Sequence, residues 1–449
     1  MNIIKRKVVE HFVSKKGDTL KRYKKLESFQ RGNFNEVQEL VETRLKTLLN
    51  HSYSNVPYYR DLFKEAGLVN HTDEIELKRF TEIPVLTKKI LKTQYDNLVS
   101  EDINKRKFFV NTSGGSTGEP VSFIQDEEYA EWREAVKILD DTWSFRLFNE
   151  KQVRLWGSEK DLLHGKETIK TRISRYLKNE VWLNAFQMSP DDMKDYVNKI
   201  NKFKPVQILA YVESVFELAK FIEKNKLKVH SPRSIMTTAG TLHPEMRMKI
   251  EEVFQTEIFN RYGSREVGDI ACECKQHKGL HVSSPTHYVE IINNKGEPVK
   301  PGEIGEILVT SLTNYAMPLI RYKIGDLGVW SDGKCKCGCN YPVLEEITGR
   351  SSDIFIANNG NRIRGGYFTK ILYDFKWINK FQVVQEEYNL INLFIISDNI
   401  TGDIQADIKG ITDKFKEVMG RDCKIEVSFV DEISFTNSGK YRYTISKVT

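Results

Sequence analysis

The segment 112–120, which reads TSGGSTGEP, has the composition of a phosphate-binding loop. Between Ser113 and Gly118 it carries three glycines and three hydroxyl side chains. Glycine lets the backbone turn sharply and approach a ligand closely, and backbone N–H groups with hydroxyls can cradle phosphate oxygens. No lysine follows the last glycine, so the segment differs from the P-loop of mononucleotide kinases. A simple glycine/serine turn in a hairpin is the alternative interpretation.

Two further segments carry groups that suit a nucleotide. Residues 262–266 (YGSRE) offer an aromatic ring that can stack on a base and a carboxylate that can hold Mg²⁺. Residues 321–326 (RYKIGD) place an acid after a glycine, where it can accept both ribose hydroxyls. Each pattern alone is also ordinary chemistry for a turn at the end of a strand.

Two more charged segments lie nearer the C-terminus. Residues 349–353 read GRSSD, and residues 437–442 (NSGKYR) place Lys440 in a loop close to the end of the chain. A lysine in such a loop is usually just exposed to solvent, so neither segment identifies a function by itself.

The cysteines are clustered. Of six cysteines, five fall between Cys272 and Cys339, in the segments 272–281 (CECKQHKGLH) and 335–339 (CKCGC). Two such knuckles can together close one tetrahedral Zn²⁺ site, although the C-x-C spacing is tighter than the commoner C-x-x-C. Buried free thiols are the first alternative, and a redox pair or disulfide is the second.

The elements expected around these segments predict an α/β protein. From about residue 105, strands alternate with helices, including a helix at about 127–141 and a strand that leads into a helix at 206–225. Strand and turn patterns dominate from 280 to 330 and indicate an antiparallel subdomain. After residue 350 the pattern starts afresh as a small α+β unit. We therefore expect a large domain at 1–350, strand-rich at about 272–350, and a small domain at 351–449.

Composition limits the class of protein. Of the 449 residues, 40% are hydrophobic, which is enough for a core and excludes a disordered chain. The net charge of 68 − 62 = +6 is too diffuse to indicate nucleic-acid binding. It has neither an 18-residue apolar run nor a signal-peptide pattern, so we expect a cytoplasmic protein. Residues 1–30 hold nine basic and three acidic residues. This indicates a solvated helical face or, alternatively, weak contact with a membrane surface.

The order of the five segments resembles the adenylate-forming superfamily, which includes acyl-CoA synthetases, adenylation domains of peptide synthetases and luciferases. The stretches SNVPYYR, YGSREVGDIACEC, GLHV, AMPLIRYKIGDL and CKCG resemble, more narrowly, the phenylacetate–CoA ligase branch and its CapK-type proteins, named for capsular polysaccharide biosynthesis. The resemblance extends from about residue 30 to the end. It implies a large α/β domain and a small mobile C-terminal lid domain.

The resemblance implies a two-step ligase. A carboxylate attacks the α-phosphate of ATP with Mg²⁺, and CoA, an amine or a sugar then displaces AMP. A role in capsular or surface polysaccharide biosynthesis follows from the CapK likeness alone. The alternative is a non-catalytic nucleotide-binding scaffold protein of a polysaccharide assembly complex. The oligomeric state stays open between monomer and homodimer.

The resemblance also implies roles for individual residues. Tyr262 would line the adenine pocket, and Gly263 and Arg265 would also belong to the nucleotide-binding residues. Glu266 would help bind Mg²⁺, and Lys440 would reach the α-phosphate and the substrate carboxylate. Asp326 would bind the ribose and Arg350 the ribose or a phosphate. The β- and γ-phosphates would lie in the loop formed by Ser113, Gly114, Gly115, Ser116, Thr117 and Gly118.

Arg265 departs from the family pattern, which has a small hydroxyl residue there. It would contact a phosphate or the substrate carboxylate, or pair with Glu266. Lys440 would enter and leave the site as the small domain rotates about the hinge. The hinge residues would be Ser351, Ser352 and Asp353, of which Ser352 replaces the usual Asp or Lys.

Two more sets follow from the branch. The acyl pocket would be lined by Tyr211, Ala239, Gly240 and Thr241. The zinc ligands would be Cys274, His281, Cys335 and Cys337, with Cys272, His277 or Cys339 as replacements for one of them. Four protein ligands would make that zinc site closed and structural.

Overall fold

The computed structural model describes residues 18–70, 75–113, 121–157, 169–186, 188–350, 353–375, 377–397, 404–433 and 441–448. The chain forms two compact units, the first of residues 1–324 and 329–346 and the second of residues 325–328 and 347–449. The sequence placed the division after residue 350. In the structure the chain passes into the second unit at residue 347, and a short piece of an earlier strand belongs to it as well.

Helices of the first unit begin at residues suited to that position. Asp126 caps its helix by accepting from the backbone N–H of Tyr129 at 2.8 Å, and Pro57 starts the helix that follows the break at Val56. The bounds are α2 Thr19–Arg31, α3 Phe34–Asn55, α4 Pro57–Glu65, α5 Lys88–Thr93, α6 Tyr95–Leu98, α7 Glu127–Trp143, α9 Ile169–Leu177, α10 Pro190–Phe203, α11 Val212–Lys224 and α12 Pro244–Phe254, with short 3₁₀ turns at Leu77–Glu82 and Ile103–Lys105. In the described part of the chain, no helix combines the length and the hydropathy that a membrane span requires.

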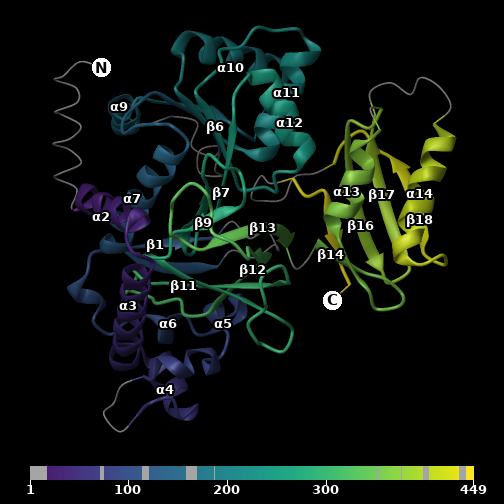
Figure 1. Ribbon diagram of the computed structural model, residues 1–449. Coiled ribbons are helices and arrows are strands. Elements are labelled where there is room, and N and C mark those ends of the chain that lie inside the picture. The colour runs from purple at the N-terminus through teal and green to yellow at the C-terminus, as the bar shows by residue number, and fades with distance from the viewer. Residues whose placement is uncertain are drawn as a thin grey trace. The chain divides into compact units, whose positions relative to one another are not determined.

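One sheet runs through the first unit in the order β10-β11-β12-β13-β9-β8-β7-β6-β5-β3-β4 (Figure 1). Its strands are β3 Gln152–Trp156, β4 Glu180–Asn184, β5 Gln207–Tyr211, β6 Ser234–Thr238, β7 Ile258–Ser264, β8 Gly268–Glu273, β9 Leu280–Val282, β10 His287–Ile292, β11 Ile304–Ser311, β12 Tyr322–Trp330 and β13 Val343–Arg350. β7 pairs parallel with β6 and antiparallel with β8. The expected antiparallel subdomain therefore continues the sheet of the parallel strands. A separate hairpin is formed by β1 Phe108–Thr112 and β2 Ser122–Asp126.

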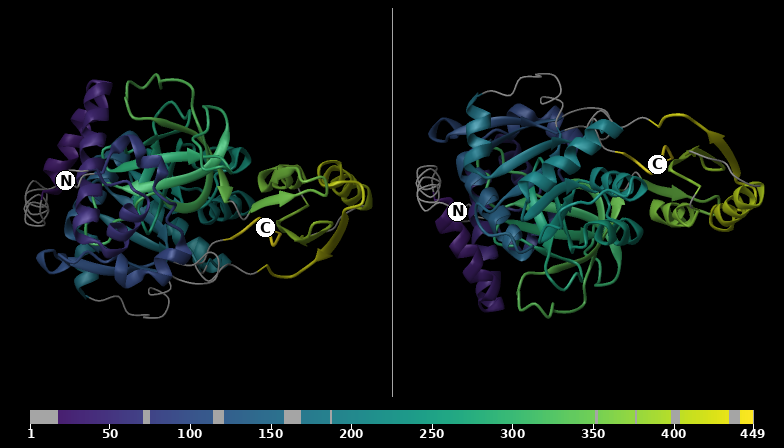
Figure 2. Two further views of the ribbon diagram at one scale, coloured as in Figure 1. Left: turned by 90° about the horizontal axis from the view of Figure 1, so that it is seen from below. Right: turned by 90° about the horizontal axis from the view of Figure 1, so that it is seen from above.

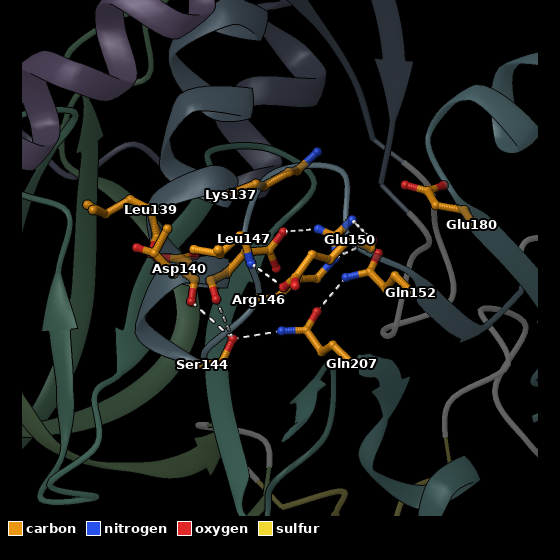
Figure 3. A network of polar contacts seen from close by, with 12 residues as sticks. Lys137, Leu139, Asp140, Ser144, Arg146, Leu147, Glu150, Gln152, Glu180 and Gln207 are labelled. Atoms are coloured by element: carbon orange, nitrogen blue, oxygen red, sulfur yellow. Dashed lines mark hydrogen bonds and ion pairs between the residues drawn. The ribbon is translucent and has the colours of Figure 1, made fainter. Parts of the chain in front are cut away.

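A buried polar network closes the amino-terminal edge of the parallel strands (Figure 3). Gln152 and Gln207, the first residues of β3 and β5, are fully buried, and Gln152 donates to the side-chain oxygen of Gln207 at 2.5 Å. Gln207 donates in turn to the hydroxyl of Ser144 at 2.7 Å, at the end of α7. Because these buried amides are satisfied by one another, the network fixes this edge of the sheet.

The second unit is a small α+β fold, drawn in yellow-green to yellow in Figure 2. Its four-stranded sheet has the order β18-β17-β16-β19, in which β16 and β17 pair antiparallel. Buried aromatic rings from helices and strands form its core, with Phe355, Phe368 and Phe415 fully buried. The bounds are β14 Ile354–Ile356, β15 Arg362–Arg364, α13 Gly365–Tyr373, β16 Lys380–Glu387, β17 Leu390–Ile396, α14 Gln405–Met419, β18 Lys424–Phe429 and β19 Thr444–Ser446.

Candidate functional site

The glycine-rich segment lies in the sequence between the two strands of the β1–β2 hairpin. Ser113 closes its base: its backbone N–H donates to the carbonyl of Val121 at 2.9 Å, and its hydroxyl accepts from the N–H of Val121 at 3.1 Å. Ser113 is buried. The predicted phosphate-binding residues Gly114, Gly115, Ser116, Thr117 and Gly118 lie outside the described residues.

The structure joins the glycine-rich hairpin to the 262–266 segment. Gln125 of β2 is fully buried, and its side-chain amide donates to the carbonyls of Arg265 at 2.9 Å and of Glu266 at 3.1 Å. The guanidinium of Arg265 donates to the carbonyl of Thr112 at 3.3 Å. Three hydrogen bonds therefore hold two segments, 140 residues apart in sequence, against each other.

The turn that carries Glu266 is shaped by a close backbone approach. β7 and β8 change register at Tyr262 and Gly263, and a Cβ atom on Gly263 would lie 2.3 Å from the carbonyl oxygen of Gly268. Only glycine fits at residue 263. The side chain of Glu266 is buried, and the phenol of Tyr322 donates to its Oε1 at 3.5 Å.

Behind this turn lies a cluster of buried charges. Asp269 of β8 forms ion pairs with Arg133 and with Arg261, each at 3.4 Å. Burial alone would raise the pKa of Asp269, but the guanidinium groups of Arg261 and Arg133 outweigh it and hold that pKa below its ordinary value. The ion pairs connect α7 to the two strands that bear the 262–266 segment.

The second unit contains two of the predicted nucleotide ligands. Arg350 and Asp326 form an ion pair with 3.6 Å between Nε and Oδ1. The backbone N–H of Arg350 donates to Asp353 at 3.4 Å, and Asp353 also pairs with Arg442. The predicted hinge residue Asp353 therefore anchors the chain beside Arg350. Ser351, Ser352 and Lys440 lie outside the described residues.

The predicted acyl-pocket residues lie where parallel strands end. Tyr211 is the last residue of β5, and Ala239, Gly240 and Thr241 follow β6. In open α/β sheets, ligands bind at the carboxyl ends of the strands. The ring of Tyr211 lies 4.4 Å from that of Trp156 and 6.1 Å from that of Phe186, measured between centroids.

The four predicted zinc ligands lie together in the first unit. The donor atoms of Cys274, His281, Cys335 and Cys337 all lie within 4.8 Å of one another. The sulfurs of Cys274 and Cys335 are 3.6 Å apart, and Cys337 Sγ lies 3.3 Å from His281 Nε2. Zn–S bonds of about 2.3 Å and Zn–N bonds of about 2.05 Å in a tetrahedron give separations of about 3.8 and 3.6 Å. The donor set therefore fits Zn²⁺.

Neighbouring groups favour this set over its alternatives. His281 Nδ1 lies 3.3 Å from the carbonyl of Tyr341, an arrangement that leaves Nε2 facing the cysteines. His277 instead contacts Glu273 at 3.2 Å, and Cys272 is buried in a separate apolar cluster. The backbone N–H of Cys339 donates to the sulfur of Cys337 at 3.3 Å. Burial raises the pKa of the Cys274 and Cys337 thiols, so metal binding must release protons.

Sequence reasoning missed three of the side chains that build these sites. Gln125, Trp156 and Phe186 carry no motif. The only local signal is the two-residue period of a strand, which places Gln125 on the same face of β2 as the buried Phe123. Nothing local indicated which backbone groups Gln125 meets.

Comparison with known proteins agrees with the predicted resemblance. Residues 355–447 match the CapK C-terminal domain. The chain is 24% identical over 427 residues to protein CapK of Staphylococcus aureus, covering 92% of this chain and 90% of that one. It is 27% identical over 351 residues to the phenylacetate–coenzyme A ligase of Escherichia coli K12, covering 75% and 76%. The likeness to CapK-type proteins and to phenylacetate–CoA ligases is thus confirmed.

The fold is also confirmed by solved structures. The crystal structure of 2-hydroxyisobutyryl-CoA ligase in the postadenylation state superposes with a TM-score of 0.75 at 18% identity, covering 94% of this chain and 92% of that one. The anthranilate CoA ligase AuaEII superposes with a TM-score of 0.54 at 16% identity, covering 74% and 65%. The α/β fold with a small C-terminal domain is therefore that of the adenylate-forming ligases.

Proposed function

We propose that this protein is an AMP-forming ligase that activates a carboxylic acid. In the first step a carboxylate oxygen bonds to the α-phosphorus of ATP and pyrophosphate leaves. In the second step a nucleophile bonds to the acyl carbon, loses its proton, and displaces AMP. The likeness to phenylacetate–CoA ligases supports this class of enzyme and supports ATP, Mg²⁺ and CoA as its reactants and cofactors.

One observation carries the proposal within the described chain. The buried Gln125 holds the 262–266 turn, which carries a candidate Mg²⁺ ligand, against the strands from which the glycine-rich segment starts and to which it returns. Glu266 is buried and accepts a hydrogen bond from the phenol of Tyr322. Carboxylate oxygens are also the ligands that Mg²⁺ prefers, so Glu266 is a candidate to bind the cation. Arg265, fixed to Thr112, adds a guanidinium suited to a phosphate.

The remaining nucleotide contacts are assigned by likeness to the superfamily. Asp326 and Arg350 would bind the ribose and a phosphate, and their mutual ion pair would orient both side chains. Tyr262 would line the adenine pocket. Lys440 would stabilise the negative charge that develops as the acid attacks the α-phosphate, because a fixed cation there acts most strongly on the transition state.

The acceptor is proposed to be CoA, with an amine or a sugar as the other acceptor classes. The likeness to CapK covers nearly the whole of both chains and motivates a role in the synthesis of a surface polysaccharide. We also propose that Zn²⁺ binds Cys274, His281, Cys335 and Cys337 and has a structural role, since the four protein donors complete its coordination.

Pyrophosphate release tests the proposed function. The protein, ATP and Mg²⁺ are incubated with a panel of carboxylic acids, with and without CoA, beside the variant Lys440→Ala and the surface control Lys447→Ala. Release that depends on one acid and falls at least 100-fold in Lys440→Ala alone supports adenylation. Acid-dependent release that CoA accelerates supports a thioester product. ATP binding without release for any acid would contradict the ligase and favour a nucleotide-binding scaffold.

A further inference from the structure

The amino-terminal edge of the parallel strands carries an exposed apolar turn. Residues 145–149 lie between α7 and β3, and in this turn Leu147 is 60% exposed while Phe145 and Phe148 are also exposed. Large apolar side chains that are exposed together indicate a surface that meets another surface. The turn is at the opposite end of the strands from Tyr211, which ends β5.

Hydrogen bonds from charged side chains hold this turn in shape. Arg146 donates to the carbonyl of Glu150 at 3.0 and 3.2 Å, and the carboxylate of Glu150 accepts from the backbone N–H of Leu147 at 2.9 Å (Figure 3). Arg233 donates to the carbonyl of Phe145 at 2.7 Å. Leu147 therefore projects from a fixed backbone.

Two neighbouring connections lie beside the turn and form one face with it. The ammonium group of Lys151 donates to the carbonyl of Phe203 at 3.0 Å, and the side-chain amide of Asn201 donates to the carbonyl of Lys228 at 2.8 Å. These bonds join the connections that precede β3, β5 and β6. We call residues 145–151, 201–206 and 225–233 together the basic face.

The basic face has a large excess of positive charge. Glu150 is its one acidic residue, so its net charge is 7 − 1 = +6, equal to that of the whole chain. The connection before β7 adds a further acid, Glu257, and leaves the excess in place. The seven basic residues are Arg146, Lys151, Lys202, Lys204, Lys226, Lys228 and Arg233, of which all but Arg146 are exposed.

Three side chains of the basic face lie on left-handed backbone. The φ angles are 63° at Phe145, 50° at Lys204 and 49° at Lys226. Lys204 is the C-cap of α10, and glycine is the residue that favours left-handed backbone at the end of a helix. Left-handed backbone destabilises a residue that has a side chain, and such strain is concentrated at functional sites. The chain therefore keeps two cations and an aromatic ring where glycine would fold with less strain.

We propose that the basic face binds an anionic phospholipid surface. Leu147 and Phe148 enter the boundary between headgroups and acyl chains, and the lysines attract the lipid phosphates. A nucleic acid would complement the lysines but would give the apolar turn no apolar environment. The carboxyl ends of the strands lie on the other side, so bound membrane leaves the proposed acyl pocket open to its reactants.

Sedimentation of the full chain with lipid vesicles tests this inference. The protein should bind vesicles of two parts phosphatidylcholine to one part phosphatidylglycerol but not phosphatidylcholine alone, and added salt should weaken the binding. Leu147→Asn should weaken it about 10-fold, because an apolar side chain no longer leaves water. Met248→Asn is the matched control, since Met248 of α12 is 62% exposed and lies outside the basic face, and it should bind as the unaltered protein does.

A pair of glycine substitutions separates binding from folding. Lys204→Gly combined with Lys226→Gly removes two cations, each worth about 5-fold in binding near an anionic surface, so vesicle affinity should fall about 25-fold. The melting temperature should stay at or above that of the unaltered protein, because glycine relieves the left-handed backbone. Lys295→Ala combined with Lys300→Ala removes the same charge from the exposed β10–β11 connection and should retain binding.

Two results would overturn the proposal. The first is no binding to the anionic vesicles, or binding that neither Leu147→Asn nor the double glycine variant weakens. The second is binding that depends on the lysines and not on Leu147, which would indicate a purely electrostatic partner such as a nucleic acid.

Discussion

The proposed zinc site gives the sharpest test of the geometry. Cys335 lies in the connection between β12 and β13, and it meets Cys274, which follows β8, at 3.6 Å. Replacing Cys335 by Ser removes one of four donors and opens a cross-link between segments 61 residues apart. Serine preserves the size of the side chain, so the change isolates metal binding from packing.

The size of the effect follows from the loop that the site closes. A cross-link across 61 residues lowers the entropy of the unfolded chain by an amount worth about 4 kcal/mol at 25 °C. The first unit spans residues 1–324 and 329–346, and its unfolding entropy is about 0.7 kcal/mol/K at the midpoint. Loss of zinc should therefore lower its melting temperature by about 6 °C.

Metal content and thermal unfolding measure this directly. The purified protein should hold one equivalent of zinc by elemental analysis, and both a strong chelator and Cys335→Ser should lower the melting temperature. Cys339→Ser is the matched control, because Cys339 lies in the same connection and contributes only its backbone N–H to Cys337. The zinc site would be refuted if the purified protein held no zinc and the chelator left its melting temperature unchanged. It would also be refuted if Cys335→Ser and Cys339→Ser lowered the melting temperature equally.

Three other predictions concern single side chains. Phe368→Ala should destabilise the second unit by about 3–5 kcal/mol in denaturant unfolding, since Phe368 is fully buried, whereas a loss below about 1 kcal/mol would contradict the packing. Tyr322→Phe should raise the Mg²⁺ concentration for half-maximal pyrophosphate release several-fold, because Glu266 loses its phenol donor; an unchanged Mg²⁺ dependence would separate Tyr322 from the metal site. Burial raises the pKa of Asp140 well above its usual value, so the folded protein holds a proton that the unfolded chain releases above about pH 4, and stability falls as pH rises from there toward the folded pKa. Asp140→Asn should therefore gain stability relative to the unaltered protein between pH 5 and 8, and equal pH slopes for both proteins would show that Asp140 is ionised when folded.

The sequence predicted those helices and strands that are determined by local residue patterns. The helix expected at about 127–141 is α7, and the strand that leads into a helix at 206–225 is β5 followed by α11. The order of the motifs also indicated the fold, which the solved ligases confirm. The single sheet could not be predicted, because β7 pairs parallel on one side and antiparallel on the other, and no local pattern specifies both partners.

The residues of the candidate sites also differ in whether the local sequence could reveal them. The clustered cysteines indicated a possible zinc site, and the family resemblance implied its four ligands. The structure brings the donor atoms of these four residues within 4.8 Å of one another. Gln125 could not be identified, since its partners are backbone carbonyls at residues 265 and 266 that only the folded chain supplies.

Because such contacts exist only in the folded chain, the motifs in the sequence do not identify the acyl group. An acid in the first turn of a helix is common because it complements the helix dipole, so Glu213 carries no signal in the sequence. Only the folded chain brings it against Gly240, 27 residues further on, where a Cβ atom would lie 2.3 Å from Oε1 of Glu213.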